Sequence, residues 1–297
     1  MTRLTDLAEL VRAPAALSVP GDVLSGAAAA GALGPRTPAL AGASVLLYWA
    51  GMAANDWADR RLDAVERPER PIPSGRVRPA VALGVASALT AAGLAVATAA
   101  GGRRAAAVAL PLAATIWGYD LRAKNTAAGP AVMAACRGLD VLLGASGGRV
   151  VRALPAALTV AAHTWTVTAL SRREVTGADR RLPGLTLAGT ALIALATPAR
   201  PTPPATGRGG SSRAARLGDL VPAVLAAGYA TRYGRAQARV LADPSPGRVR
   251  AAVGAGITGL PALQGALTAR AGARMLGLAV AGAAPLGRRL ARLISPT

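Results

Sequence analysis

Three aspartates, Asp56, Asp59 and Asp63, have the spacing of a metal-binding surface. They stand at positions i, i+3 and i+7, so on an α-helix they fall in one stripe roughly 60° wide. Carboxylates that close repel one another unless a cation lies among them, and Mg²⁺ prefers carboxylate oxygens together with substrate phosphates. The spacing therefore predicts a magnesium site that binds a diphosphate. A solvated acidic turn between two helices is the alternative.

The remaining acidic residues are few and unevenly placed. Of fourteen Asp and Glu residues, five lie between 56 and 69, and the others include Asp120, Glu174 and Asp179, at the ends of later apolar runs. If those runs cross a membrane, all three groups lie on the same side of it. A carboxylate that faces lipid is costly, so acids in membrane proteins usually line a pocket or a polar entrance. We therefore expect the three acidic segments to meet.

Basic residues accompany these acids. Lys124, the only lysine, closely follows Tyr119 and Asp120 and offers a compact charge to a phosphate oxygen. Arg137 and Asp140 stand at i and i+3 within an apolar run, so they fall on one helix face. Either they form an ion pair that fixes helix packing, or Arg137 faces the pocket.

For two other polar stretches, a purely structural role has to be weighed against a functional role. The segment 171–181 is either an ordinary basic loop or a second carboxylate cluster opposite the first. His163, the only histidine, lies within an apolar run beside Thr164 and Thr166, and we expect it to be buried and hydrogen-bonded rather than to act as a base.

The composition points to lipid as the solvent. Of the 297 residues 52% are hydrophobic and only 16% are charged, against about 25% in an average soluble domain, and the mean hydropathy is +0.38. The net charge of +20 would suggest nucleic acid in a soluble protein, but the arginines cluster between apolar runs and no nucleic-acid-binding motif is present. Cys136 is the only cysteine, which excludes an internal disulfide.

Apolar runs of roughly membrane-spanning length predict a single domain, 1–297, that is an all-α, polytopic bundle of nine or ten transmembrane helices. The ten runs are 13–33, 38–56, 79–100, 104–120, 127–146, 153–171, 183–198, 217–233, 249–268 and 273–291. We expect the first run to remain as a membrane helix, and arginine-rich connections place the N-terminus and the acidic segments in the cytoplasm. The Pro, Gly and Ser residues of 199–216 predict a mobile loop.

The motif residues resemble those of a known family. Asn55-Asp56, Asp59 and Asp63, followed by Arg67-Pro68-Glu69-Arg70-Pro71-Ile72-Pro73-Ser74-Gly75-Arg76, are similar to the first aspartate motif of the UbiA superfamily of membrane prenyltransferases. The chain most resembles the branch that includes EboC and related actinobacterial members. Arg12, Gly21-Asp22, Tyr119-Asp120 with Lys124, Cys136-Arg137 and the segment 171–179 stand where that family has pocket residues.

The resemblance implies about nine transmembrane helices around a central cavity and two acidic motifs that bind a prenyl diphosphate through Mg²⁺. Asp56, Asp59 and Asp63 would hold one metal ion, and Glu174 and Asp179 would complete a second position. The implied substrate-binding residues are Asn55, Arg70, Tyr119, Lys124, Arg137 and Arg173. The second motif differs from that of most members, because it has fewer carboxylates and is one residue longer.

The expected activity is Mg²⁺-dependent transfer of a prenyl group from an isoprenoid diphosphate to an acceptor that the sequence does not specify. Mg²⁺ and cations such as Lys124 would neutralise the leaving diphosphate, and Asp120 is the candidate base. The alternatives are a transporter that uses Arg137, Asp140 and His163, or a membrane protein that binds an isoprenoid without converting it. A CDP-alcohol phosphotransferase is disfavoured because its Asp-Gly-x-x-Ala-Arg motif is absent.

Overall fold

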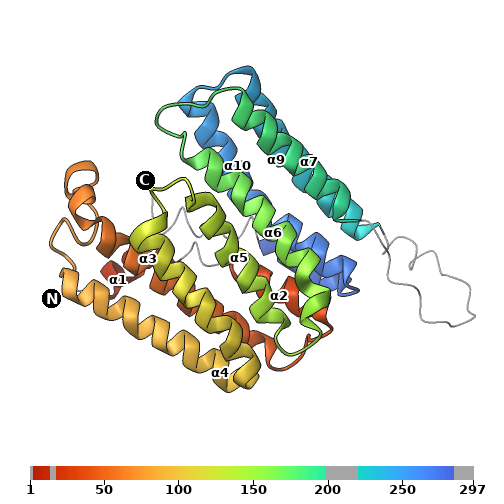
Figure 1. Cartoon of the computed structure of the whole chain (residues 1–297), viewed down its shortest axis with the longest axis horizontal. Coiled ribbons are helices and arrows are strands. Elements are labelled where there is room, and N and C mark those ends of the chain that lie inside the picture. The colour runs from red at the N-terminus through yellow and green to blue at the C-terminus, as the bar shows by residue number, and fades with distance from the viewer. Residues whose placement is uncertain (1–2, 14–17, 199–219, 284–297) are drawn as a thin grey trace, which may run out of the picture.

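The computed structural model describes residues 3–13, 18–198 and 220–283, and throughout these ranges its regular secondary structure is helical (Figure 1). The predicted loop 199–216 lies outside the described residues. The helices are α1 (Leu4–Leu10), α2 (Pro20–Ala30), α3 (Thr37–Glu66), α4 (Pro79–Gly118), the π-helix η2 (Tyr119–Ala123), α5 (Gly129–Ala145), α6 (Val150–Ser171), α7 (Arg181–Ala196), α9 (Val221–Ala242) and α10 (Pro246–Arg270). A further apolar helix is described over Arg274–Ala283. The predicted all-helical fold is confirmed.

The bundle has two halves that meet at α5. On one side α3 and α4 lie along each other, and on the other α6, α7, α9 and α10 form a second group, as Figure 1 shows. The helix α5 contacts α2, α4 and α6, so it links the two groups. One buried cluster lies among α2, α3, α4 and α5, and a second lies among α5, α6, α7, α9 and α10.

Small residues allow this close packing. A Cβ atom added to Gly26 on α2 would overlap the carbonyl oxygen of Val141 on α5, and one added to Gly144 would overlap that of Val23. Gly256 on α10 packs in the same way against the ring of Tyr233. Glycines at such positions let two helix backbones approach where any side chain would separate them, a feature of helix packing in membranes.

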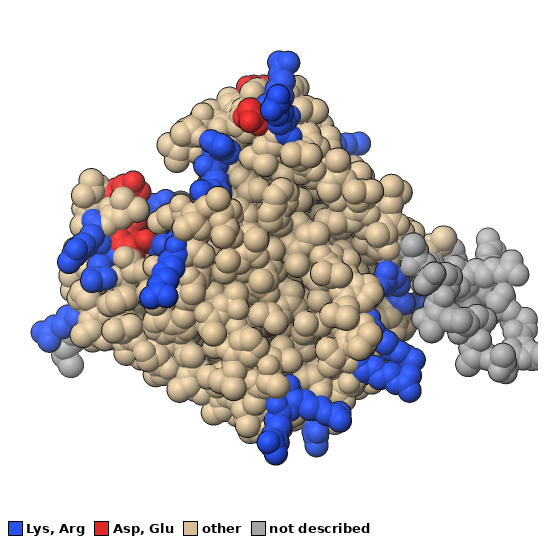
Figure 2. Space-filling model, viewed as in Figure 1, with Lys and Arg blue, Asp and Glu red and all other residues tan. Residues whose placement is uncertain are grey.

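In the part of the chain that the structure describes, three helical segments are long and apolar enough to cross a membrane, namely Thr37–Glu66, Pro79–Ala123 and Val150–Ser171. The second of these contains the predicted runs 79–100 and 104–120, which a kink at Gly102 separates (φ 61°). Most charged side chains on the face seen in Figure 2 lie along two opposite borders, with a broad uncharged band between them. This distribution is the one expected of a protein that spans a membrane.

Two boundaries differ from the sequence prediction in a way that matters for the site. The run 38–56 ends where charged residues begin, but α3 continues ten residues further, to Glu66. Its hydrogen-bonded backbone therefore carries all three aspartates on one helix, beyond the apolar part. The run 13–33 becomes the shorter α2 (Pro20–Ala30), and residues 14–17 lie outside the described part of the chain.

Candidate functional site

The C-terminal half of α3 presents two buried carboxylates on one face. Asp56 is 4% exposed and Asp63 is 2% exposed. The loop that follows α3 folds back, so that Nη1 of Arg70 lies 3.4 Å from Asp56 Oδ1 and 2.7 Å from Asp63 Oδ2. Because one guanidinium contacts both acids, the two side chains share a helix face, as their spacing of seven residues predicts.

A second arginine reaches Asp56 from the N-terminal segment. Nη2 of Arg12 donates a hydrogen bond to Asp56 Oδ1 at 3.0 Å. Arg12 has a φ of 47°, which a residue with a side chain rarely adopts, and it is the one non-glycine residue with positive φ in the described part of the chain. Strained backbone of this kind is common at functional sites, where the surrounding contacts hold it in place. Here the ion pair with Asp56 is such a contact.

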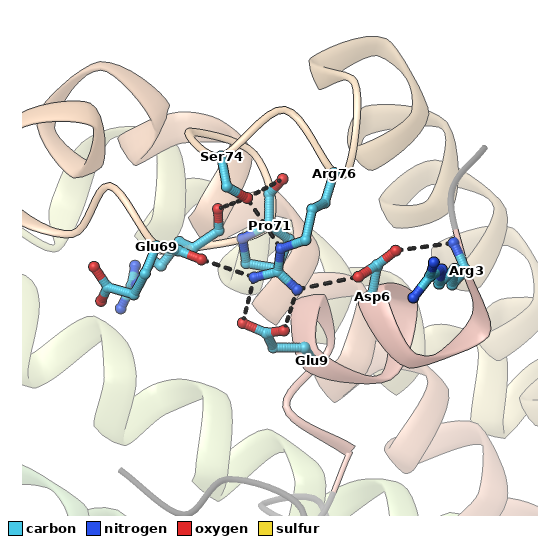
Figure 3. A network of polar contacts seen from close by, with 8 residues as sticks. Arg3, Asp6, Glu9, Glu69, Pro71, Ser74 and Arg76 are labelled. Carbon is cyan, nitrogen blue, oxygen red and sulfur yellow. Dashed lines mark hydrogen bonds and ion pairs between the residues drawn. The ribbon is translucent and has the colours of Figure 1, made fainter.

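The short helix α1 is fixed over the loop that carries Arg70. Figure 3 shows Arg76 between the carboxylates of Asp6 and Glu9 and the carbonyl oxygen of Glu69. Its Nη1 lies 3.0 Å from Asp6 Oδ1 and 2.6 Å from Glu9 Oε2, and its Nη2 donates to Glu69 O at 2.7 Å. The backbone N–H of Arg3, followed by Arg76, lowers the pKa of Asp6. These contacts connect α1 to the loop and so place Arg12, two residues after α1 ends, near Asp56.

The third aspartate of the stripe turns to a different partner. Asp59 Oδ1 lies 2.7 Å from Nζ of Lys124, just after the π-helix η2. One turn earlier on α3, Asn55 Nδ2 donates to Oδ1 of the buried Asp120 at 3.0 Å. A π-helix is rare and is frequently found at functional sites. The π-helix η2 brings Asp120 and Lys124 against α3. The predicted meeting of the acidic segment 56–69 with Asp120 is therefore confirmed.

An apolar cavity between α3, α4 and α5 extends from this cluster into the bundle. Tyr119 and Asp120 are among its lining residues, as are Ser44 and Asp140. Asn55 contacts Asp120 at one end of the cavity, and Ser44 contacts Asp140 at the other. Ser44 and Asn55 are eleven residues apart on α3, so these two polar pairs are separated by about 16 Å. Between them the wall is almost entirely apolar. It includes Leu47, Met52, Leu112, Ile116 and Met133.

Arg137 also lines the cavity, which agrees with the alternative in which it faces the pocket, and its ion-pair partner is not Asp140. Its Nε lies 2.8 Å from Oδ2 of Asp22 on α2, and Gln264 on α10 donates to the other oxygen of Asp22 at 2.6 Å. Asp140 instead accepts a hydrogen bond of 2.6 Å from Ser44. Of the two readings of Arg137 and Asp140, the mutual ion pair is therefore wrong, because each side chain finds a closer partner on a neighbouring helix.

The two carboxylates of the second acidic segment have different surroundings. Burial raises the pKa of Glu174, and the charges of Arg250 and Arg67 act against this rise. Arg67 is also 4.0 Å from Asp63, so the charge of one arginine acts on an acid of each segment. Asp179 accepts a hydrogen bond from the backbone N–H of Leu182 at 2.9 Å, which caps the start of α7.

Arg173 and His163, two further residues singled out from the sequence, lie outside the acidic cluster of α3. Arg173 is exposed and belongs to the turn after α6. The neighbouring Arg172 donates to the carbonyl oxygen of Thr126, which joins this turn to the segment before α5. His163 is buried, and its Nδ1 is 2.8 Å from the hydroxyl of Tyr229, so the expected buried, hydrogen-bonded histidine is confirmed.

The donor atoms of the cluster fit a magnesium ion by type, since they are carboxylate oxygens. Within residues 3–13, 18–198 and 220–283, however, no three His, Cys, Asp or Glu side chains form a group close enough to hold a metal. The ion pairs explain this. Asp56 and Asp63 contact arginines, and Asp59 contacts Lys124. A metal ion at these acids would share their oxygens with the basic side chains or displace them.

Comparison with known proteins agrees with the geometry. Residues 21–197 match the family described as the UbiA prenyltransferase family. A solved structure of a digeranylgeranylglyceryl phosphate synthase has a TM-score of 0.67 at 16% identity, covering 91% of this chain and 99% of that one. A UbiA homologue from Aeropyrum pernix K1 has a TM-score of 0.59 at 18% identity, over 88% of this chain and 96% of that one. At these identities the likeness shows a shared fold.

Local sequence similarity to curated proteins is stronger but short. The digeranylgeranylglyceryl phosphate synthase of Natronomonas pharaonis is 45% identical over 85 residues, which are 28% of this chain and 31% of that protein. The bacteriochlorophyll synthase 33 kDa chain of Cereibacter sphaeroides is 46% identical over 54 residues, 18% of each chain. The match thus spans less than a third of these relatives. The family match covers more than half of the chain, and the protein belongs to the UbiA prenyltransferase family.

Proposed function

We propose that the protein transfers a prenyl group from an isoprenoid diphosphate to an acceptor, with Mg²⁺ as cofactor and release of diphosphate. The observation that carries the proposal is the cluster of Asp56, Asp59 and Asp63 with Arg12, Arg70 and Lys124 beside an apolar cavity. Acids suited to Mg²⁺ and cations suited to phosphate therefore stand next to a space suited to a hydrocarbon chain. The match to the UbiA prenyltransferase family supports the same activity.

The proposal gives each residue of the cluster a task. Asp56, Asp59 and Asp63 would hold Mg²⁺ with help from Asn55, and Glu174 is the better placed of the two second-motif acids because Asp179 caps α7. Bound Mg²⁺ would neutralise the charge that builds on the departing diphosphate. Oxygen atoms of the diphosphate would be bound by basic side chains, namely Arg12, Arg70, Lys124 and Arg173.

The cavity supplies the other half of the site. Its apolar wall can hold the isoprenoid chain and exclude water, which would otherwise capture an allylic carbocation. Tyr119 and Asp120 line the cavity, and in this proposal C1 of the prenyl group would lie near them, with Asp120 as the candidate to accept a proton from the acceptor. Arg137 lines the cavity further along and is the remaining proposed substrate contact.

The place in the cell and the finer classification are also proposals. We propose a single multi-pass domain in the cell membrane, with the N-terminus and the loops of the site in the cytoplasm, because of the basic residues in those loops. Its partners would be a prenyl diphosphate, an acceptor still to be identified and membrane lipids, with no nucleic acid. The assignment to the branch that includes EboC depends on residues 55–76, whereas the relatives that match are digeranylgeranylglyceryl phosphate and bacteriochlorophyll synthases.

Incubation of membranes that contain the protein with labelled prenyl diphosphates of several lengths and Mg²⁺ tests the proposal. We expect diphosphate release that EDTA stops and that Asp56→Asn or Asp59→Asn lowers by about a hundredfold or more. Glu66→Gln is a matched control, because Glu66 is an exposed acid in the last turn of the same helix. Release that is equal in all four proteins would reject the site assignment.

The same assay separates the alternatives. A protein that only binds isoprenoids would retain the labelled diphosphate in a manner that depends on Asp56 but would release none. A transporter would depend on Arg137, Asp140 and His163, yet His163 lies in the other buried cluster, against Tyr229 and Tyr233. This separation disfavours a continuous polar pathway through the three residues.

A further inference from the structure

A basic groove lies on the outer surface between α9 and α10, and none of the residues proposed for prenyl transfer lines it. Four arginines line it: Arg232, Arg235, Arg239 and Arg248. Small residues such as Ala227, Gly228, Ala251 and Ala255 form the rest of the wall. Three of the four arginines thus come from α9, and small residues of both helices form the rest of the lining.

The periodicity of α9 places three of these arginines in one stripe. Arg232, Arg235 and Arg239 stand at i, i+3 and i+7, and all three are exposed. The opposite face of the helix is buried and holds Tyr229 and Tyr233, which are 0% exposed. The arginines therefore occupy the outward face of a helix whose inward face belongs to the bundle core.

The stripe has almost no compensating negative charge. Within the described residues, no carboxylate lies within ion-pair distance of Arg232, Arg235 or Arg239. Arg232 donates a hydrogen bond to Thr258 Oγ1 at 3.1 Å, and Arg248 contacts Asp243 at 3.6 Å in an exposed pair that contributes little. Three adjacent guanidinium groups that repel one another favour an anion between them.

The position of the stripe along α9 indicates what that anion is. Arg239 lies about 5 Å and Arg232 about 15 Å from the C-terminal end of α9 at Ala242. Arg232 stands at the end of the predicted apolar run 217–233, and Arg235 and Arg239 follow that run on the same helix. Basic residues that follow an apolar span face the headgroup region, and basic pockets between membrane helices bind lipid phosphates.

We propose that the groove between α9 and α10 binds the phosphate headgroup of an anionic phospholipid. The guanidinium groups of Arg232, Arg235 and Arg239 hold the phosphate oxygens, and Arg248 closes the site from α10. An acyl chain of the same lipid lies along the small residues, where no bulky side chain blocks it.

Purified full-length protein in a neutral detergent tests this site. Phosphatidylglycerol or phosphatidylcholine is added in mixed micelles, and bound lipid is counted by native mass spectrometry while the midpoint of thermal unfolding is recorded. We expect phosphatidylglycerol to remain bound and to raise the midpoint, and Arg232→Gln/Arg235→Gln/Arg239→Gln to weaken its apparent affinity at least tenfold. The control replaces three exposed arginines elsewhere: Arg103→Gln/Arg149→Gln/Arg152→Gln.

Each possible result decides the question. Loss of phosphatidylglycerol binding in the groove variant alone supports the site. An equal loss of binding in both triple variants overturns the site, because the effect is then one of net charge. Equal binding of phosphatidylglycerol and phosphatidylcholine also overturns it, because the protein then does not distinguish an anionic lipid from a neutral one. If inorganic phosphate displaces the lipid at millimolar concentration, the groove is a site for a soluble anion instead. The variant Arg235→Gln/Arg239→Gln keeps the bond from Arg232 to Thr258 and guards against misfolding, and neither readout depends on prenyl transfer.

Discussion

Removal of Arg70 is the sharpest test of how the acidic cluster is held together. Its Nη1 lies 2.7 Å from Asp63 and 3.4 Å from Asp56, and its side chain is only 19% exposed. At an effective dielectric constant near 20, these contacts correspond to about 6 and 5 kcal/mol of attraction. The cost of removing Arg70 from water offsets part of this attraction, and loss of one partner from a buried pair typically costs about 3 to 5 kcal/mol.

We expect Arg70→Met to lie at the low end of that range, about 3 kcal/mol, because Arg12 still contacts Asp56. For a chain of this size such a loss lowers the midpoint of thermal unfolding by about 6 to 12 °C. The control is Arg67→Met in the same loop. Arg67 is 4.0 Å from Asp63 and its side chain is 53% exposed, so its loss should cost at most about 1 kcal/mol.

Addition of Mg²⁺ gives this test a second readout. Without Arg70, Asp56 and Asp63 lack their shared cation, so Mg²⁺ should restore part of the lost midpoint in Arg70→Met and change the wild-type protein little. Sodium chloride at equal ionic strength controls for screening. If Arg70→Met unfolds at the temperature of Arg67→Met, the reasoning about the buried pair is wrong, and if Mg²⁺ has no effect the acids do not bind it.

Three further predictions follow from other parts of the structure. Lys124→Met should raise the prenyl diphosphate concentration needed for half-maximal rate by about tenfold, as measured by diphosphate release, because a charge-assisted contact is lost. Gly144→Ala should lower the yield of folded protein, since its Cβ would overlap the carbonyl oxygen of Val23, whereas Gly84→Ala, with no atom within 4 Å of the added Cβ, should not. The backbone N–H of Arg3 and then the guanidinium of Arg76 lower the pKa of Asp6, so these contacts stabilise the protein above the ordinary pKa of 3.8, and this stabilisation is lost as the pH falls further. Hydrogen exchange of α1, corrected for its intrinsic pH dependence, should therefore accelerate only below about pH 4 in the wild-type protein but already at pH 7 in Arg76→Gln.

The sequence predicts the acidic face of α3 well because that face depends on local geometry. A spacing of i and i+7 puts Asp56 and Asp63 on one side of any α-helix, and Arg70 shows that it does so here. The end of the helix was harder to predict. Hydropathy falls at the first charged residues, but backbone hydrogen bonding continues to Glu66, because a helix end that leaves the membrane can be polar.

The partners of the polar residues could not be predicted, because they lie far apart in the chain. Arg12 contacts Asp56 across 44 residues, Ser44 contacts Asp140 across 96, and Gln264 contacts Asp22 across 242. No periodicity connects such positions; only the packing of whole helices does. The resemblance to the UbiA superfamily indicated Arg12 and Asp22 as pocket residues but did not indicate which side chains they contact.

The charge balance of the cluster explains why metal and diphosphate are expected to bind together. Among its described contacts, the three carboxylates of Asp56, Asp59 and Asp63 face Arg12, Arg70 and Lys124, and the more exposed Arg67 lies 4.0 Å from Asp63. Mg²⁺ alone would add positive charge beside those cations, and diphosphate alone would add negative charge beside the acids, so each is opposed by half of the cluster. A magnesium diphosphate carries both signs. Its metal can take the carboxylate oxygens while the basic side chains turn to its phosphates, so every ion pair that is broken is replaced by another.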